Sequence, residues 1–365
     1  MSRSHQPLHL FCIVLIALSA ALMLSSCGDN TSDPEGTTAA EHPEGQPPSQ
    51  APILDGPQPT TQASTVFFLA ADASVSHQAS QILLLQSLAR ASSGLTLQIA
   101  DARGNTATQA TQLQQAASAK AAAIIIQPVN ALDLASDMQQ AKAGGALILS
   151  LDAQSPNTAC DAILFANQET LGKKAGELIV GALTQKAKDE GQTTVSGRVV
   201  ELRGTDESPS CTARDRGLNA ALAAEPGVIL VHDAPTHWNP KDTLDRFQEA
   251  LRLQKNFDVI YAHDDIIAQA AAEAAVAAGI RENVFIVGTD GLGGEGLGIE
   301  ALRNHHIDAT FYQPYLVDLA WRIVERHQAD PNFKPKPRYE FQTMLITPGT
   351  LDDLQRKGYP AAPAL

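Results

Sequence analysis

From residue 65 onward, short apolar runs alternate with segments of helical periodicity, and this alternation most constrains the fold. Uninterrupted apolar runs, such as residues 121–126 and 146–151, are typical of strands buried on both faces of a parallel sheet. Repeated strand–helix units therefore predict an α/β fold with parallel sheets wrapped by helices. We expect strands at residues 66–71, 95–100, 121–126, 146–151, 162–166, 197–202, 228–231, 259–262, 284–287 and 309–312.

Helical segments are expected between these strands, and the series starts again after Asn167, which suggests two similar lobes. The residues that follow the helices support their limits, as where Gly144-Gly145 ends one of them. Residues 339–346 are expected to form an extended tail. The expected helices are residues 78–91, 109–120, 132–143, 169–188, 211–224, 241–253, 266–278 and 316–328.

Several expected strands end in a carboxylate or an amide: Asp101, Gln127, Asp152, Asp264 and Asp290. In open α/β sheets, ligands bind just beyond the carboxyl ends of the strands. Turn chemistry and helix capping explain part of this pattern. We retain Asp152, Asp264 and Asp290 as candidates, because a carboxylate accepts strong hydrogen bonds from ligand hydroxyls.

A glycine-rich turn follows Asp290, with glycines at 291, 293 and 296. This spacing matches the G-x-G-x-x-G pattern that holds a dinucleotide pyrophosphate. However, Asp290 and Glu295 would repel a phosphate, and the turn closes the last of many strand–helix units instead of the first. We therefore expect no cofactor and interpret the glycines as a tight turn that directs Asp290 into a cleft.

The N-terminus has the pattern of an export signal. A charged start, an apolar run and small residues make up residues 1–26. The sequence Leu24-Ser25-Ser26-Cys27 resembles a bacterial lipobox, which implies cleavage before Cys27 and acylation of its thiol. A retained membrane anchor is the alternative. Residues 27–64 have the polar, Pro-rich composition of a disordered linker, so we expect an exported protein, periplasmic or on the cell surface, tethered by lipid.

Composition excludes some classes of function. A formal net charge of −14 argues against nucleic-acid binding, which needs clustered Lys and Arg. No nucleophile–base pair and no metal-ligand spacing stand out, so we expect neither an enzyme nor a metal site. After signal removal and acylation, Cys160 and Cys211 remain, either as a disulfide or as two separate buried thiols.

Six stretches together resemble the periplasmic ribose-binding protein family, the type I sugar-binding components of bacterial importers. They stand in the family's order and span about residues 65–346. As a set they are specific, although each alone is weak. They are AAAIIIQPVN at 121–130, LSLD at 149–152, ARDRG at 213–217, YAHDD at 261–265, VGTDG at 287–291 and ATFYQP at 309–314.

The resemblance implies two Rossmann-like lobes joined by a hinge, with a sugar bound between them. The N-terminal lobe would be residues 65–166 and 314–340, and the C-terminal lobe residues 167–313 and 341–365. It also implies the binding residues: Asp152, Arg214, Trp238, Asp264, Asp290 and Gln313. For two of these a structural role is the alternative, because Trp238 could pack in the core and Arg214 could neutralise Asp264 or Asp290.

The loop after the first strand departs from the family. Val75 stands where the family has Asn, and His77 and Gln78 replace a pair of Phe, which leaves His77 as a weak binding candidate. Ala153 replaces an Arg, and Asp264 replaces an Asn. Ribose is therefore doubtful, and another sugar, a polyol or an amine-bearing ligand is open.

We expect a monomeric solute-binding lipoprotein that passes a small sugar or polyol to the membrane permease of an ABC importer. A sensory protein that presents the ligand to a membrane receptor or kinase would have the same sequence features. A sugar-responsive regulator needs an N-terminal helix-turn-helix, but the signal and the acidic linker occupy that place. A Rossmann enzyme needs a bound cofactor.

Overall fold

The computed structural model describes residues 63–206, 208–293, 297–330 and 332–357. All of them belong to one compact unit, Pro59–Leu365. The expected signal sequence, Cys27 and nearly all of the linker lie outside the described residues. Within the described ranges, no helix has the length and apolar character needed to span a membrane.

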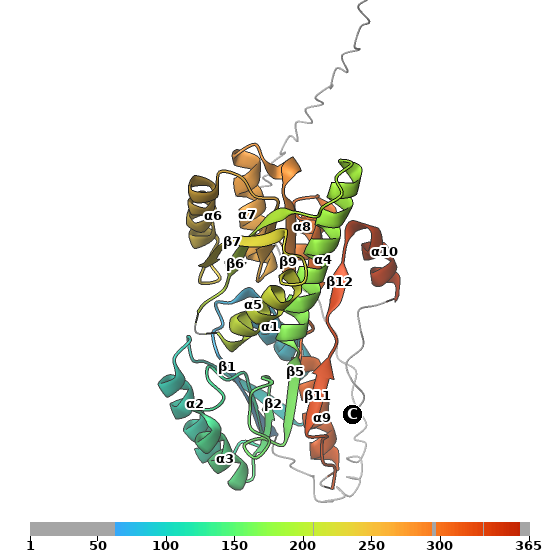
Figure 1. Cartoon of the computed structure of the whole chain (residues 1–365). Helices are drawn as coiled ribbons and strands as arrows, with labels where there is room; N and C mark the ends of the chain where they lie inside the picture. Colours follow the sequence, from blue (N-terminus) through green and yellow to red (C-terminus); the bar gives the residue numbers. More distant parts are fainter. Residues whose placement is uncertain (1–62, 207, 294–296, 331, 358–365) are drawn as a thin grey trace, which may run out of the picture. The chain divides into compact units, whose positions relative to one another are not determined.

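The described strands form two six-stranded sheets, and this confirms the predicted two-lobe α/β fold (Figure 1). The first sheet is entirely parallel and has the order β11-β5-β4-β3-β1-β2. We call the part of the chain built on it the first lobe. Its strands are β1 (Ser64–Ala70), β2 (Leu95–Asp101), β3 (Ala123–Ile126), β4 (Leu147–Ser150), β5 (Ala162–Ala166) and β11 (Arg338–Phe341).

The second sheet, which carries the second lobe, has the order β12-β10-β9-β8-β6-β7. It is parallel except for β12, which pairs antiparallel with β10. In the described ranges, the chain passes between the sheets after β5, after β10 and after β11. The strands are β6 (Gly197–Arg203), β7 (Val228–Pro235), β8 (Val259–Ala262), β9 (Phe285–Asp290), β10 (Ala309–Tyr312) and β12 (Met344–Ile346).

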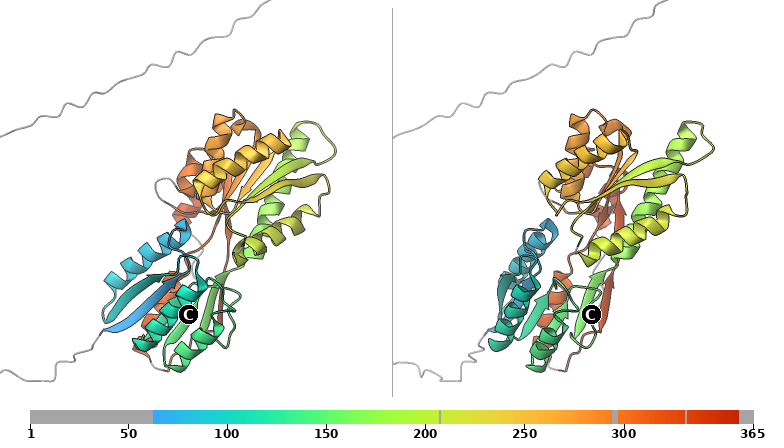
Figure 2. Two further views of the ribbon diagram at one scale, coloured as in Figure 1. Left: turned by 90° about the vertical axis from the view of Figure 1, so that its left-hand side faces the viewer. Right: turned by 60° about the vertical axis from the view of Figure 1, so that its left-hand side comes forward.

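Helices cover both faces of each sheet, because alternate strand residues point to opposite faces and both sets are apolar (Figure 2). In the first lobe, Val66 and Phe68 pack toward α1 (Ser76–Ala91) and α9 (Val317–Ala329). Phe67 and Leu69 pack toward the opposite pair, α2 (Thr106–Ser118) and α3 (Ala135–Ala143).

The second lobe repeats this arrangement. Val199 and Tyr261 pack toward α4 (Gln168–Asp189) and α5 (Pro209–Leu222). Val200 and Ile260 pack on the other face toward α6, α7 and α8. These helices are α6 (Pro240–Gln254), α7 (Asp265–Ala277) and α8 (Gly298–Arg303), and α10 (Pro348–Lys357) follows β12.

Some element limits differ from the prediction. Residues 339–346 are not one extended tail, because β11 joins the first sheet and β12 the second. The strand expected at 228–231 continues to Pro235, since β7 pairs with β6 as far as Arg203, with a shift of register between Val199 and Val200. Helices α8 and α10 were not predicted from the sequence.

Candidate functional site

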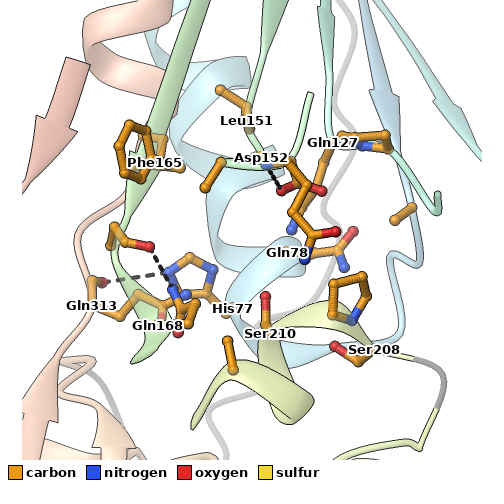
Figure 3. Close-up of a pocket in the computed structure, with 18 of the residues that line it drawn as sticks. His77, Gln78, Gln127, Leu151, Asp152, Phe165, Gln168, Ser208, Ser210 and Gln313 are labelled. Carbon is orange, nitrogen blue, oxygen red and sulfur yellow. Dashed lines mark hydrogen bonds between the residues drawn. The ribbon is translucent and has the colours of Figure 1, made fainter. Parts of the chain in front are cut away.

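A cavity of about 710 Å³ lies at the carboxyl ends of the strands and takes lining residues from both lobes (Figure 3). Its first-lobe side includes residues of the loops after β1, β3 and β4, and its second-lobe side includes the starts of α4 and α5. Most of the side chains that carry chemistry there are polar and uncharged. The lining residues discussed below are His77, Gln78, Gln127, Asp152, Phe165, Gln168, Ser208, Ser210, Trp238, Gln313 and Arg338.

Asp152 lines the cavity, as predicted for a residue after β4. Its Oδ1 accepts a hydrogen bond of 2.7 Å from the backbone N–H of Gln154. Burial raises the pKa of Asp152, whereas the hydrogen bond from Gln154 and the charge of Arg338 lower it. The carboxylate is therefore partly buried beside a cation, a setting that suits hydrogen bonds from ligand hydroxyls.

Arg338 is a lining residue that sequence reasoning missed. It enters from β11, its guanidinium lies 4.5 Å from the centre of the Phe165 ring, and Nη2 donates to the carbonyl of Ala153 at 3.1 Å. An arginine from a distant strand thus contacts the backbone of the residue that follows Asp152. No local pattern could reveal this, because the contact spans 185 residues of sequence.

His77 also lines the cavity, but both ring nitrogens are directed at protein atoms. Nδ1 lies 2.9 Å from Gln81 Nε2, and Nε2 lies 3.4 Å from the carbonyl oxygen of Gln313. This pattern assigns a neutral ring with the proton on Nε2. Burial lowers the pKa of His77 to about 4, so the ring is neutral at pH 7. His77 connects α1 to the segment that follows β10.

Arg214 does not line the cavity but holds two residues that do. It is buried on α5, where Nε donates to Gln168 Oε1 at 2.8 Å and Nη2 donates to Gln313 Oε1 at 2.6 Å. Nη1 donates to the carbonyl oxygen of His263. These bonds fix both carboxamide oxygens and therefore orient the side-chain NH₂ groups of Gln168 and Gln313. These contacts give Arg214 a structural role, but none of them is to Asp264 or Asp290, on which it acts only through its charge, which lowers the pKa of both. Ligand contact by Arg214 stays a prediction.

Asp264 and Asp290 are 2% and 3% exposed and do not line the cavity. Asp264 caps α7, where Oδ1 accepts from the backbone N–H of Ile267 at 2.6 Å. The neighbouring Asp265 accepts from the backbone N–H of Gly291 at 2.7 Å and from Thr310 Oγ1 at 2.5 Å. The structure thus gathers three carboxylates at the ends of β8 and β9, and ligand contact by Asp264 and Asp290 stays a prediction.

These carboxylates are held in an unfavourable environment for charge. Burial raises the pKa of Asp264 to about 6, although the hydrogen bond from Ile267 and the charge of Arg214 lower it. Burial, with the charge of Asp264, raises the pKa of Asp265 to about 7. Burial and both neighbouring carboxylates raise the pKa of Asp290 well above its usual range. Such shifts often mark functional sites, but structural clusters produce them too.

Trp238 lines the second-lobe side of the cavity and is half-buried. It follows His237, and both residues have left-handed backbone angles, with φ of 52° at His237 and 57° at Trp238. The indole lies against Gly204, where an added Cβ would come within 2.0 Å of Cζ2. A bulky residue in this conformation is uncommon. Trp238 also packs against the second-lobe core, as the alternative expected, and stacking on a sugar ring stays a prediction.

The possible disulfide between Cys160 and Cys211 is not formed, and both cysteines are free and buried. Cys160 packs in the first lobe with α2 and α3, and its Sγ lies 3.3 Å from the carbonyl oxygen of Pro156. Cys211 lies in the first turn of α5 in the second lobe. The alternative of two separate buried thiols is therefore the correct one.

Four lining residues, Gln78, Gln127, Ser208 and Ser210, were not predicted as ligand contacts. Gln127 was noted only as a polar strand end and was attributed to turn chemistry or helix capping. Gln78 accepts a hydrogen bond from the backbone N–H of Asp72 at 2.9 Å, which fixes the loop after β1. Ser208 and Ser210 begin α5 and gave no sequence signal beyond helix capping.

Comparison with protein families gives one match, which covers residues 76–323 and is described as a periplasmic binding protein domain. The chain belongs to this family. The matched residues include the strands from β2 to β10 and most of the cavity lining. The family and its relatives are binding proteins, which supports a binding function over catalysis and agrees with an exported protein.

Individual relatives are distant. The D-apiose import binding protein of Actinobacillus succinogenes is 24% identical over 203 residues, which is 55% of this chain and 61% of the relative. The myo-inositol binding protein of Caulobacter, solved with myo-inositol, has a TM-score of 0.70 at 22% identity, covering 82% of this chain and 98% of that one. The fructose binding periplasmic domain of a hybrid two-component system has the same TM-score and identity, covering 80% and 94%.

Proposed function

We propose that this periplasmic binding protein captures a small sugar or polyol between its lobes and delivers it to the permease of an ABC importer. Acylation of Cys27 would hold it at the membrane, with residues 28–64 as a tether. The observation that carries the proposal is the cavity, which combines lining residues from the strand ends of both sheets.

The chemistry of the lining suits a neutral, hydroxyl-rich ligand. Gln127 and Ser210 supply an amide and a hydroxyl, groups that both donate and accept, and Asp152 adds an acceptor. Phe165 and Trp238 offer apolar ring faces to the C–H surfaces of a sugar. A few placed polar groups with aromatic surfaces are the usual composition of a small-molecule site.

Hinge closure is the proposed mechanism. A ligand that touches both lobes binds the closed state more tightly than the open state and shifts the equilibrium toward closure. A ligand with micromolar affinity supplies about −8 kcal/mol, which exceeds the few kcal/mol that separate such states. The permease would then recognise the closed form.

A ligand panel tests the proposal. Purified Pro59–Leu365 is screened by thermal shift and then by calorimetry against pentoses, hexoses in both ring forms, inositols and amino sugars. We expect one class of sugar or polyol to raise the melting temperature by several degrees and to bind with one site per chain. If every member of a broad panel leaves both signals unchanged, sugar and polyol capture is wrong.

A sensory function is the second candidate, because the likeness to a periplasmic domain of a two-component system covers most of this chain. Both functions share the cavity, so binding data cannot separate them. Deletion of the gene would abolish uptake of the labelled ligand if the protein serves an importer. Unchanged uptake, together with loss of ligand-dependent transcription, would favour the sensor.

A further inference from the structure

Three carboxylates gather in the second lobe, away from the cavity. Glu201 lies on β6, Asp233 on β7 and Asp215 on α5, and one carboxylate oxygen of each lies within 4.8 Å of the other two. Glu201 and Asp233 are register partners on adjacent parallel strands, so their side chains share a face of the sheet. Val199, on the same face as Glu201, packs toward α5, which places Asp215 above that face.

The innermost carboxylate has an oxygen without a protein donor. The Glu201 side chain is fully buried, and its Oε1 lies 2.8 Å from Nε2 of the buried His263. Among the described residues, no N–H or hydroxyl donor reaches its buried Oε2, and the carboxyl group within hydrogen-bonding reach of Glu201 is that of Asp215. Leaving a buried oxygen unsatisfied costs about 1–3 kcal/mol, and more when the group is charged. A native structure rarely keeps such an oxygen unless something outside the protein binds it.

The charges around the cluster do not balance. Arg203 pairs with both Asp233 and Asp206, the latter at 2.5 Å. The Arg203 guanidinium thus pairs with two carboxylates. In the described chain, Asp215 instead accepts from the side chain of Asn219 at 2.6 Å, and Glu201 meets His263. Burial and the charges of Asp233 and Asp215 raise the pKa of Glu201 well above its usual range.

We propose that Glu201, Asp215 and Asp233 bind a hard divalent cation of the Ca²⁺ type. All the donors are carboxylate oxygens, which Ca²⁺, Mg²⁺ and Mn²⁺ prefer over softer ligands. Ca²⁺ binds oxygen at about 2.3–2.6 Å, so donors on opposite sides of the ion are at most roughly 5 Å apart. The observed separation of the three oxygens meets this limit.

The environment supports a surface-accessible ion with one anchored ligand. His263, as the Nε2–H tautomer, donates to Oε1 of Glu201 and fixes its orientation, as outer hydrogen bonds do for carboxylate ligands. Asp233 is exposed and Asp215 half-exposed, which leaves a path from solvent. The three ligands come from separate elements at positions 201, 215 and 233, so no sequence motif could reveal them.

Calorimetry on the full-length protein tests the proposal, after treatment with a chelator and without any sugar. Ca²⁺ should bind with one site per chain and raise the melting temperature by several degrees. Glu201→Gln and Asp233→Asn should each weaken Ca²⁺ binding by at least about 10-fold, as expected for loss of a ligand. Asp206→Asn is the matched control, since Asp206 shares Arg203 but is outside the cluster, and it should retain Ca²⁺ binding.

Two results would overturn the proposal of a cation site. Absence of both heat and thermal shift at millimolar Ca²⁺ or Mg²⁺ in the wild-type protein would overturn the proposal. Retention of the wild-type Ca²⁺ affinity by Asp233→Asn would place the ion elsewhere and overturn it too. Asp233 is on the surface, so this variant is expected to fold even if Glu201→Gln does not. If neither the wild type nor Glu201→Gln binds Ca²⁺ and Glu201→Gln is the more stable protein, the carboxylates share a proton and do not bind a cation.

Discussion

At the scale of single residues, Arg214 organises the site without lining it. Its guanidinium has three neutral acceptors: Gln168, Gln313 and the carbonyl of His263. Two of these residues line the cavity, and one of them, Gln313, also meets His77 through its backbone carbonyl. One buried cation therefore links the start of α4, the end of β8 and the segment after β10.

Replacing Arg214 with Lys should destabilise the fold by roughly 3 kcal/mol. Lysine keeps the charge but cannot reproduce the planar set of donors, and each charged hydrogen bond is worth about 1.5–3 kcal/mol. Urea unfolding measures the change, and Arg216→Lys on the same helix is the control, because Arg216 is exposed and pairs only at the surface with Glu169. Equal stability of the two variants would refute this role.

Asp265 should make stability depend on pH. Its folded pKa of about 7 exceeds its unfolded value of about 3.9, so the folded state binds more protons between these values. Wild-type stability should therefore fall as pH rises through this window. Asp265→Asn cannot ionise, and its amide can still serve Gly291 N and Thr310 Oγ1. Its stability relative to wild type should be higher at pH 8 than at pH 5 by roughly 2 kcal/mol.

Urea unfolding of both proteins at pH 5 and pH 8 measures this difference. His77, whose lowered pKa acts in the opposite direction below about pH 6.5, is present in both proteins and cancels in the comparison. An Asp265→Asn variant with the same pH dependence as wild type would show that Asp265 does not carry the buried charge.

Residue roles were harder to predict than residue positions. Asp152 lines the cavity because a strand end fixes its place. Asp264 also follows a strand, but it caps α7, and the sequence cannot separate a cap from a ligand because both need the same side chain. Arg338 meets Ala153 across 185 residues of sequence, and Nε2 of His77 meets Gln313 across 236, and no local pattern encodes either contact.

At the scale of elements, α4 and α5 approach backbone to backbone. A Cβ at Gly172 of α4 would lie 2.0 Å from the carbonyl oxygen of Arg214, and one at Gly217 of α5 would lie 2.1 Å from that of Glu169. Only glycine allows this approach, which brings Gln168 within hydrogen-bonding reach of Arg214. The helix contact therefore sets part of the cavity wall.

Gly172→Ala should separate these helices and destabilise the fold by about 1–3 kcal/mol, the usual cost of overpacking. Gly181→Ala, on the same helix, is the control, because nothing lies within 4 Å of its added Cβ. Removing an exposed glycine from a helix interior should stabilise by roughly 0.5–1 kcal/mol. Thermal or urea unfolding measures the change in stability of each variant, which should be a loss for Gly172→Ala and a gain for Gly181→Ala. Two variants of equal stability would contradict the close contact.

Most elements were predictable because buried parallel strands are continuous apolar runs, as in β3 and β9. The strand pairing at the end of the chain was not predictable in this way. β11 and β12 lie three residues apart but pair in different sheets, which depends on partners at Ile163 and Thr310. Apolar periodicity reports burial but not which strand lies alongside, so the third passage between the sheets was implied only by the family resemblance, which divided the lobes between residues 340 and 341.

At the scale of the whole molecule, the proposed lipid anchor determines where the binding protein works. Cys27→Ser should move the protein from the membrane fraction to the soluble fraction of cells, because the thiol that would carry the lipid is gone. Cys12→Ser, within the predicted signal, is the control and should leave the protein in the membrane fraction. Immunoblots of fractionated cells measure both variants, and a Cys27→Ser protein that stays with membranes would argue for a retained signal anchor.

The central claim is that one ligand is held by both lobes at once. Calorimetric titration with the tightest sugar or polyol tests it in Asp152→Asn, on the first-lobe side, and Trp238→Leu, on the second-lobe side. We predict that each variant weakens binding at least 10-fold, since each removes a direct contact worth about 1.4 kcal/mol or more. Wild-type affinity in either variant would show that its lobe does not contact the ligand there and would contradict the account.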